Sequence, residues 1–201
     1  MKQLGTEERL LAAGRRVMAQ AGAMSVRDIA AQAGVTPGAI YRHFPNKEAL
    51  IERVVAEAFE TLASGLWRAL AKFPEGSVDR LAEVGRAYMA FAREHPAEYG
   101  LLFAARSSPL PVGASPMSGL LEIGEQCVRD CIASQALLPN DPKLVTLMLW
   151  SRLHGLVTLF QAFDFRQQFP GPRGVNPLDV AVEATRGLLL AGLQGHQNVG
   201  Q

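Results

Sequence analysis

Apolar residues recur every three or four positions along most of the chain, which is the spacing of one face of an α-helix. Beyond residue 60, no segment shows the alternation of apolar and polar residues that indicates a strand. The stretch 104–117 is rich in proline and serine and is expected to be a loop. The pattern therefore predicts an all-α protein of about nine helices, at 5–21, 26–33, 37–43, 46–72, 77–95, 99–103, 117–136, 142–164 and 177–195.

Residues 25–47 carry the signals of two very short helices joined by a tight turn. Ser25 can cap the first helix, with Asp28 at the third position as in a capping box. Gly34 can end this helix, because glycine accepts the left-handed conformation found just past many helix ends. Such a unit is too small to hold a core by itself, and it has the shape that enters a DNA major groove.

The second short helix is bounded by two prolines. Thr36 is expected to cap it with its hydroxyl, and Pro37 suits the first helical position because it loses no hydrogen bond there. Pro45 ends the helix near Phe44, since the residue before a proline disfavours helical geometry. Asn46 is then expected to cap the next, longer helix.

The composition of helix 37–43 is typical of a contact surface more than of a structural element. Ile40 is its one good core residue, and Gly38 and Ala39 have almost no side chain. A thin helix lets the backbone approach phosphates and base edges closely. The alternative is an ordinary surface helix with solvated polar side chains.

Residues 6–55 resemble the DNA-binding domain of the TetR family of transcriptional repressors. The resemblance rests on the turn 33–36 and on Tyr41, His43, Phe44, Asn46 and Lys47. It implies that the following residues contact DNA: Arg27, Thr36, Pro37, Gly38, Ala39, Tyr41, Arg42, His43 and Lys47. Among them, Tyr41, His43 and Lys47 resemble phosphate contacts of the family. Because glycine has no side chain, base readout is expected to depend on Arg27, Thr36 and Arg42.

The charges support a division into two domains. The net charge of the chain is only +1, but residues 1–55 carry eight Lys or Arg against five Asp or Glu, and residues 56–201 carry twelve against fourteen. The positive excess therefore lies where phosphate contacts are expected. We expect a helix-turn-helix domain at 1–55 and a larger helical ligand-binding and dimerisation domain at 56–201.

The composition also bounds where the protein acts. Almost half of the residues are apolar, which excludes general disorder. No apolar run reaches the length that spans a bilayer, and the first residues lack the apolar stretch of a signal peptide. We therefore expect a soluble, cytoplasmic protein without a membrane partner.

Helix 142–164 is apolar nearly all round, so it is expected to lie in a core or at a subunit interface. Its residues Trp150, His154 and Gly155 resemble the Trp-His-Gly signature of one class of TetR ligand domains. The Trp-His-Gly resemblance supports the architecture, while the resemblance to the TetR family as a whole implies a small-molecule effector in the larger domain. The candidate pocket residues are Tyr88, Phe91, Tyr99, Phe103, Trp150, Leu153 and His154. Each aromatic residue has ordinary core packing as its alternative. His154 needs a polar partner in such a helix, either a protein group or a ligand.

Specific DNA binding by so small a unit is expected to need two copies, because a two-fold dimer doubles the contacts and reads a palindrome. The two apolar helices at the end of the chain can pair with their copies in a four-helix interface. The residues expected there are Leu149, Leu156, Phe160, Leu178, Val182, Leu189 and Leu193.

Cys127 and Cys131 lie one helical turn apart, without further ligand residues at metal-binding spacing, and are interpreted as reduced core residues. No cofactor or metal is expected. No nucleophile with its base was found, so an enzyme is not expected. The sequence favours a homodimeric repressor released from a palindromic operator on double-stranded DNA by a small, largely apolar effector. The alternative is an architectural or activating DNA-binding regulator without an effector.

Overall fold

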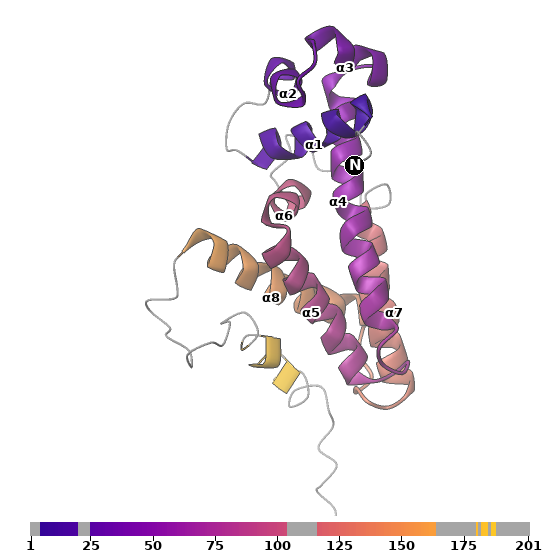
Figure 1. Ribbon diagram of the computed structural model, residues 1–201. Helices are drawn as coiled ribbons and strands as arrows, with labels where there is room; N and C mark the ends of the chain where they lie inside the picture. The colour runs from indigo at the N-terminus through magenta and orange to yellow at the C-terminus, as the bar shows by residue number, and fades with distance from the viewer. Residues whose placement is uncertain are drawn as a thin grey trace, which may run out of the picture. The chain divides into compact units, whose positions relative to one another are not determined.

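A computed structural model describes residues 5–19, 25–103, 116–163, 180, 182–184 and 186–187. The described residues form helices and no strand, and the all-α prediction is confirmed. Figure 1 shows the helices α1 (Thr6–Ala19), α2 (Val26–Ala33), α3 (Pro37–His43), α4 (Lys47–Leu70), α5 (Val78–Glu94), α6 (Pro96–Phe103), α7 (Pro116–Ala133) and α8 (Pro142–Ala162).

These bounds lie within three residues of the predicted ones. Most of the predicted helix 177–195 and of the predicted loop 104–117 falls outside the described residues. Residues 180, 182–184 and 186–187 are helical, as predicted.

The predicted stop and start signals around α2 and α3 are confirmed, with one exception. The Ser25 hydroxyl accepts a hydrogen bond from the Asp28 N–H, and the Asp28 carboxylate accepts one from the Ser25 N–H, which completes the capping box. Gly34 has φ 65°, in the left-handed region. The Asn46 side chain accepts a hydrogen bond from the N–H of Ala49 at 2.8 Å.

The prediction that the Thr36 hydroxyl caps α3 is wrong, because its side chain makes no capping hydrogen bond. The N–H of Ala39 instead donates to the backbone carbonyl of Thr36 at 2.9 Å. The donor that a threonine cap would have used is therefore already satisfied, and the Thr36 side chain remains exposed.

The contacts divide the chain into two compact units, one of residues 1–62 and 92–109 and the other of 63–91 and 110–201. The division falls inside α4 and α5. It follows packing, so it does not test the functional boundary predicted at residues 55 and 56.

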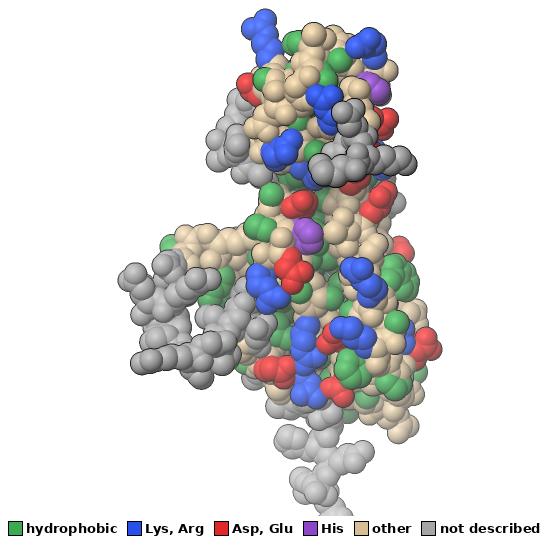
Figure 2. Space-filling view, viewed as in Figure 1, with side chains coloured by type: hydrophobic (Ala, Val, Ile, Leu, Met, Phe, Trp, Pro, Cys, Tyr) green, Lys and Arg blue, Asp and Glu red, His purple; other side chains and the backbone are tan. Residues whose placement is uncertain are grey.

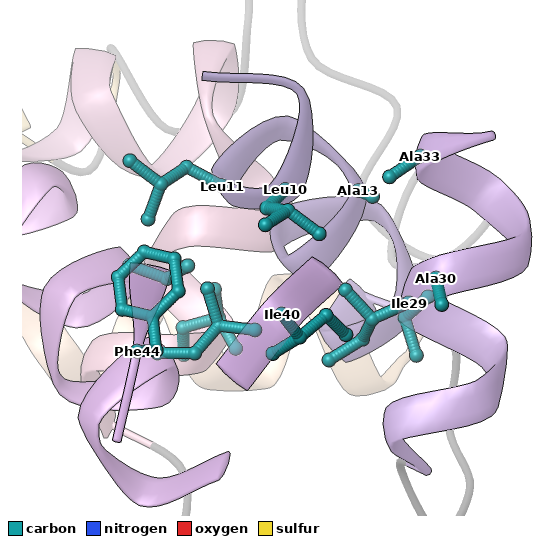
Figure 3. Close-up of a cluster of buried hydrophobic side chains, with 12 residues drawn as sticks. Leu10, Leu11, Ala13, Ile29, Ala30, Ala33, Ile40 and Phe44 are labelled. Atoms are coloured by element: carbon teal, nitrogen blue, oxygen red, sulfur yellow. The ribbon is translucent and has the colours of Figure 1, made fainter. Parts of the chain in front are cut away.

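The first unit is organised around α1, which packs against α2 and α6, while α2 packs against α3. Figure 3 shows Leu10 and Leu11 from α1, Ile29 from α2 and Ile40 from α3 in one buried cluster, with Phe44 just after α3. The two short helices thus share a core with α1, α4 and α6, as expected for elements too short to fold alone.

In the second unit α7 packs closely against α8. A Cβ atom placed on Gly124 of α7 would lie 2.7 Å from Cγ2 of Thr146 of α8, so only glycine allows this approach. Gly155 differs, because a Cβ atom there would meet no described atom within 4 Å.

Cys127 and Cys131 are buried, without a disulfide, in agreement with the prediction of core residues. Burial raises the pKa of the Cys127 thiol, and it raises the pKa of the Cys131 thiol to about 11. Both thiols are therefore protonated near neutral pH, which disfavours metal binding and nucleophilic chemistry.

None of the described helices combines the length and the apolar character required to cross a bilayer.

The left-handed Gly34 yields a stability prediction. Gly34→Ala forces a Cβ atom into φ 65° and places it 3.0 Å from Nη2 of Arg9. We expect a loss of about 1–2 kcal/mol in the free energy of unfolding. Gly38→Ala is the control, because its Cβ meets no described atom within 4 Å and alanine favours helix by about 1 kcal/mol. Urea unfolding followed by circular dichroism measures wild type and both variants. A Gly34→Ala midpoint equal to that of wild type would contradict the prediction.

Candidate nucleic-acid surface and ligand cavity

Helix α3 buries one side and exposes nearly all of its remaining side chains. Ile40 is fully buried and Ala39 is 3% exposed, whereas Tyr41 is 56% exposed. The other predicted contact residues on or beside α3 are exposed as well: Thr36, Pro37, Gly38, Arg42 and His43. Figure 2 shows Lys, Arg and His side chains on the surface around α2 and α3.

The neighbouring elements contribute two further predicted residues. Arg27 is exposed on α2, and Lys47 is half-buried at the first position of α4. A helix N-terminus favours a phosphate, since its free N–H groups and dipole attract negative charge. Ala39 is 3% exposed, so its methyl group is buried under α3, and the DNA contact expected of this residue stays a prediction.

Arg9 is a positioning residue that sequence reasoning missed. Its guanidinium donates to the carbonyl of Ala33 and, at 3.1 Å, to the carbonyl of Gly34. These carbonyls belong to the end of α2 and the turn that follows it. Arg9 therefore ties the turn between the two short helices to α1. No pattern in the sequence distinguishes it from other arginines.

The second unit contains a cavity of about 100 Å³. Its described lining comes from α4, α5, α7, α8 and the helical residues 182 and 186: Leu66, Leu81, Ala82, Val84, Gly85, Tyr88, Leu120, Leu121, Gly124, Thr146, Leu149, Trp150, Leu153, Val182 and Arg186. Nearly all of these side chains are apolar. Sequence reasoning selected Tyr88, Trp150 and Leu153 for this role and missed Thr146 and Arg186.

Three other predicted pocket residues lie elsewhere. Phe91 is buried in the second unit but is not among the described lining residues. Tyr99 and Phe103 belong to α6 in the first unit, where their rings pack with centroids 4.7 Å apart. Tyr99 is almost fully buried. Core packing was the alternative for both, and Tyr99 lies in the core, whereas Phe103 is half-buried.

His154 has a protein partner. Its Nδ1 lies 3.0 Å from the hydroxyl oxygen of Tyr88, and its ring centroid lies 5.3 Å from that of Trp150. Burial lowers the pKa of His154, because a charged imidazolium would lose solvation there. His154 therefore lies behind the cavity wall, supporting Tyr88 and Trp150, and is not itself among the lining residues.

Ion pairs join Glu183 and Arg186, near the end of the chain, to α5. Arg186 lies 2.6 Å from Asp79 and 3.7 Å from Glu183, and Glu183 lies 2.5 Å from Arg86. The hydrogen bond from Arg86 lowers the pKa of Glu183 and raises that of Arg86. Each charge on this side of the cavity is therefore compensated by a neighbour of opposite sign.

The predicted interface residues fall into three groups. Leu149 and Val182 line the cavity; Val182 is buried and Leu149 is half-buried. Leu156 and Phe160 are half-buried on α8. Leu178, Leu189 and Leu193 lie outside the described residues. Sequence reasoning missed a set of exposed apolar side chains on α8 and just after it: Leu144, Leu147, Met148, Leu159 and Phe163.

Comparison with known families accounts for both units. A family model described as "Bacterial regulatory proteins, tetR family" matches residues 10–54. A second, described as "Tetracyclin repressor-like, C-terminal domain", matches residues 81–193, more than half of the chain. The chain belongs to the TetR family. It is a DNA-binding transcriptional regulator of this family, and its assignment to the Trp-His-Gly class stays a prediction.

The chain is also similar to individual known proteins. The HTH-type transcriptional regulator Rv1816 of Mycobacterium tuberculosis is 25% identical over 188 residues, which covers 76% of this chain and 79% of that protein. A protein of unknown function from Rhodococcus sp. RHA1 is 24% identical and superimposes with a TM-score of 0.76, over 96% of this chain and 97% of that one. FadR from Bacillus subtilis in complex with stearoyl-CoA is 21% identical, with a TM-score of 0.76 over 92% and 98%. The likeness to the two solved structures is one of fold.

The lowered pKa of His154 predicts a pH dependence of stability in this TetR protein. The unfolded chain binds a proton at the ordinary histidine pKa, near 6.5, while the folded chain binds it only at lower pH. The free energy of unfolding should therefore fall as the pH drops below about 6.5. His154→Asn should weaken this dependence, and Tyr88→Phe, which keeps the imidazole, should retain it. Urea unfolding at pH 5.0–7.5 tests this, and an unchanged dependence in His154→Asn would contradict it.

Proposed function

We propose that the protein is a homodimeric repressor that binds a palindromic operator in the cytoplasm and releases it when a small, largely apolar effector binds. The observation that carries the DNA-binding part is the exposed face of α3, held over the buried Ile40. The effector part is supported by the apolar cavity of the second unit.

The surface around α3 supplies the groups that operator binding needs. Arg27 and Arg42 are exposed and can donate to base edges. The Thr36 hydroxyl, which makes no capping hydrogen bond, can do the same. Tyr41, His43 and Lys47 can bind phosphates and so fix the position of α3 in the groove. The core that anchors Ile40 and Phe44 keeps these donors in a fixed arrangement, which favours specific readout.

The exposed apolar side chains of α8 support a dimer. Helix α8 carries few charged residues. Four of its apolar side chains are each about half exposed or more: Leu144, Leu147, Met148 and Leu159. Pairing this face with its copy would remove the apolar area from water, which stabilises association. A two-fold dimer also presents two copies of α3 to two half-sites.

The cavity supports release by a small molecule. Its apolar lining favours an effector with an apolar body over the alternative in which the helical domain only dimerises. The neighbour FadR was solved with stearoyl-CoA, a ligand with a long apolar chain. Helices α4 and α5 each supply residues to both units, so a ligand between them in the second unit acts on helices that continue into the first.

Substitutions at α3 and α4 test the DNA-binding surface. Arg42→Ala should reduce discrimination between the operator and random DNA, because a base contact is lost. Lys47→Ala should weaken binding to all DNA alike, since a phosphate contact carries no sequence information. It should also lower the slope of log binding constant against log salt concentration by about 1, because one phosphate contact is lost. Fluorescence anisotropy with DNA upstream of the protein's own gene, at several salt concentrations and with random competitor, measures both effects.

The matched control is Lys143→Ala, which removes an exposed lysine at the start of α8. It should leave operator affinity and salt dependence unchanged. If Lys47→Ala behaves like Lys143→Ala, the proposed phosphate contact is wrong.

A charge on the exposed face of α8 tests the dimer. Leu159→Asp should dissociate it, because a carboxylate would be buried without a partner at the interface. Leu159 is 47% exposed, so this change is tolerated by the monomer better than one at the half-buried Leu156. Leu138→Asp, at a leucine that is 46% exposed outside α8, is the control. Light scattering measures the mass of each variant, and a Leu159→Asp dimer would refute this interface.

A further inference from the structure

Two polar atoms of the cavity lining are buried without a partner. Thr146 is 6% exposed, and among the described residues its Oγ1 has no hydrogen-bond partner. Nε of Arg186 is likewise buried and unpaired. Both residues line the cavity. The other described lining side chains are apolar except for Tyr88, whose hydroxyl already contacts His154, and the indole N–H of Trp150. An unpaired buried polar group destabilises the empty protein and gains a hydrogen bond when a ligand supplies one.

The packing of Thr146 holds its hydroxyl in this state. The methyl group of Thr146 is the atom that lies against Gly124, so the hydroxyl oxygen lies farther from α7. A Cβ atom on Gly124 would be 2.7 Å from that methyl group and 3.7 Å from the hydroxyl oxygen. The tight contact between α7 and α8 thus fixes which side of Thr146 faces the neighbouring helix.

The charges around Arg186 bound the ligand's own charge. The guanidinium is paired with Asp79 and Glu183, so the one cationic side chain among the described lining residues is already compensated. Nε of Arg186 can only donate a hydrogen bond, and the Thr146 hydroxyl can donate one as well. The complementary ligand atom is therefore a neutral acceptor, such as a carbonyl oxygen.

We propose that the cavity binds a small, uncharged molecule with an apolar body and a carbonyl group, and that Thr146 is the residue that recognises the carbonyl. This inference deepens the proposed function, because it names the chemical class of the effector. The binding site itself is testable without DNA.

Two pairs of probes of matched shape test the role of the hydroxyl. Acetophenone is paired with α-methylstyrene, and heptan-2-one with 2-methylhept-1-ene, so that each alkene replaces the carbonyl oxygen by a methylene group. Dissociation constants are measured by calorimetry on the full chain without DNA. Thr146→Val should weaken ketone binding about ten-fold and leave alkene binding unchanged or tighter, because the variant lacks only the hydroxyl.

The control variant is Thr158→Val on the same helix. Thr158 is exposed, and its hydroxyl donates to the carbonyl of His154 at 2.9 Å, away from the described lining. It should leave all four constants unchanged. Thr146→Val should unfold at the same or a higher urea concentration than wild type, since it removes an unpaired buried hydroxyl, so a folding defect does not obscure the comparison.

Three results would overturn the proposal. The first is that Thr146→Val weakens ketone and alkene equally, the second that neither ketone binds wild type, and the third that benzoate binds more tightly than acetophenone. Adding the ketone to the protein–operator complex then tests the proposed function separately. A ketone that binds but does not release DNA would contradict effector release and leave the assigned site intact.

Discussion

The proposed DNA-binding surface depends on the burial of Ile40 and Phe44 beneath a helix of only seven residues. A helix of that length is unstable alone in water, because nucleation costs more than its few hydrogen bonds return. The apolar residues of α1 supply the missing stability, and the capping box, the left-handed Gly34 and the hydrogen bonds from Arg9 fix the turn. Because the buried core fixes the position of α3, its exposed face can carry small and cationic residues. In the proposed function, this core would hold α3 in place while most of its side chains stay available to DNA.

The cavity lies beside the close approach of α7 and α8, and both residues of that contact, Gly124 and Thr146, belong to its lining. Close packing normally leaves few voids and few unpaired polar atoms. Here the lining keeps both an empty volume of about 100 Å³ and two unpaired polar atoms, Oγ1 of Thr146 and Nε of Arg186. Each feature costs stability, and a ligand with a matching acceptor removes both costs. A regulator benefits from this arrangement, because the stability gained on binding is the free energy available to shift its conformation.

The elements of the first unit could be predicted from the sequence because their signals are local. Ser25, Gly34 and Pro45 act on their own backbone, so reading the neighbouring residues suffices to set the ends of α2 and α3. The Thr36 cap was wrong because the backbone of the same turn competes for the same N–H. The cavity was only partly predictable. Tyr88, Trp150 and Leu153 stand out as large residues at helical spacing, but Tyr99 and Phe103 look the same and lie in the first unit. Thr146 differs from any other helical threonine only by what packs around it.

The same reasoning separates the two roles that the sequence suggested for α8. An apolar helix can face a core or a second subunit, and periodicity alone does not divide its residues between them. Burial does: Leu149 and Leu153 line the cavity, while Leu147 and Met148 are exposed. In the proposed dimer, one helix would therefore carry the cavity wall on one side and the subunit contact on the other. A ligand that displaces Leu149 or Trp150 would then act directly on the helix that forms the proposed subunit contact. In this way it would change the distance between the two copies of α3.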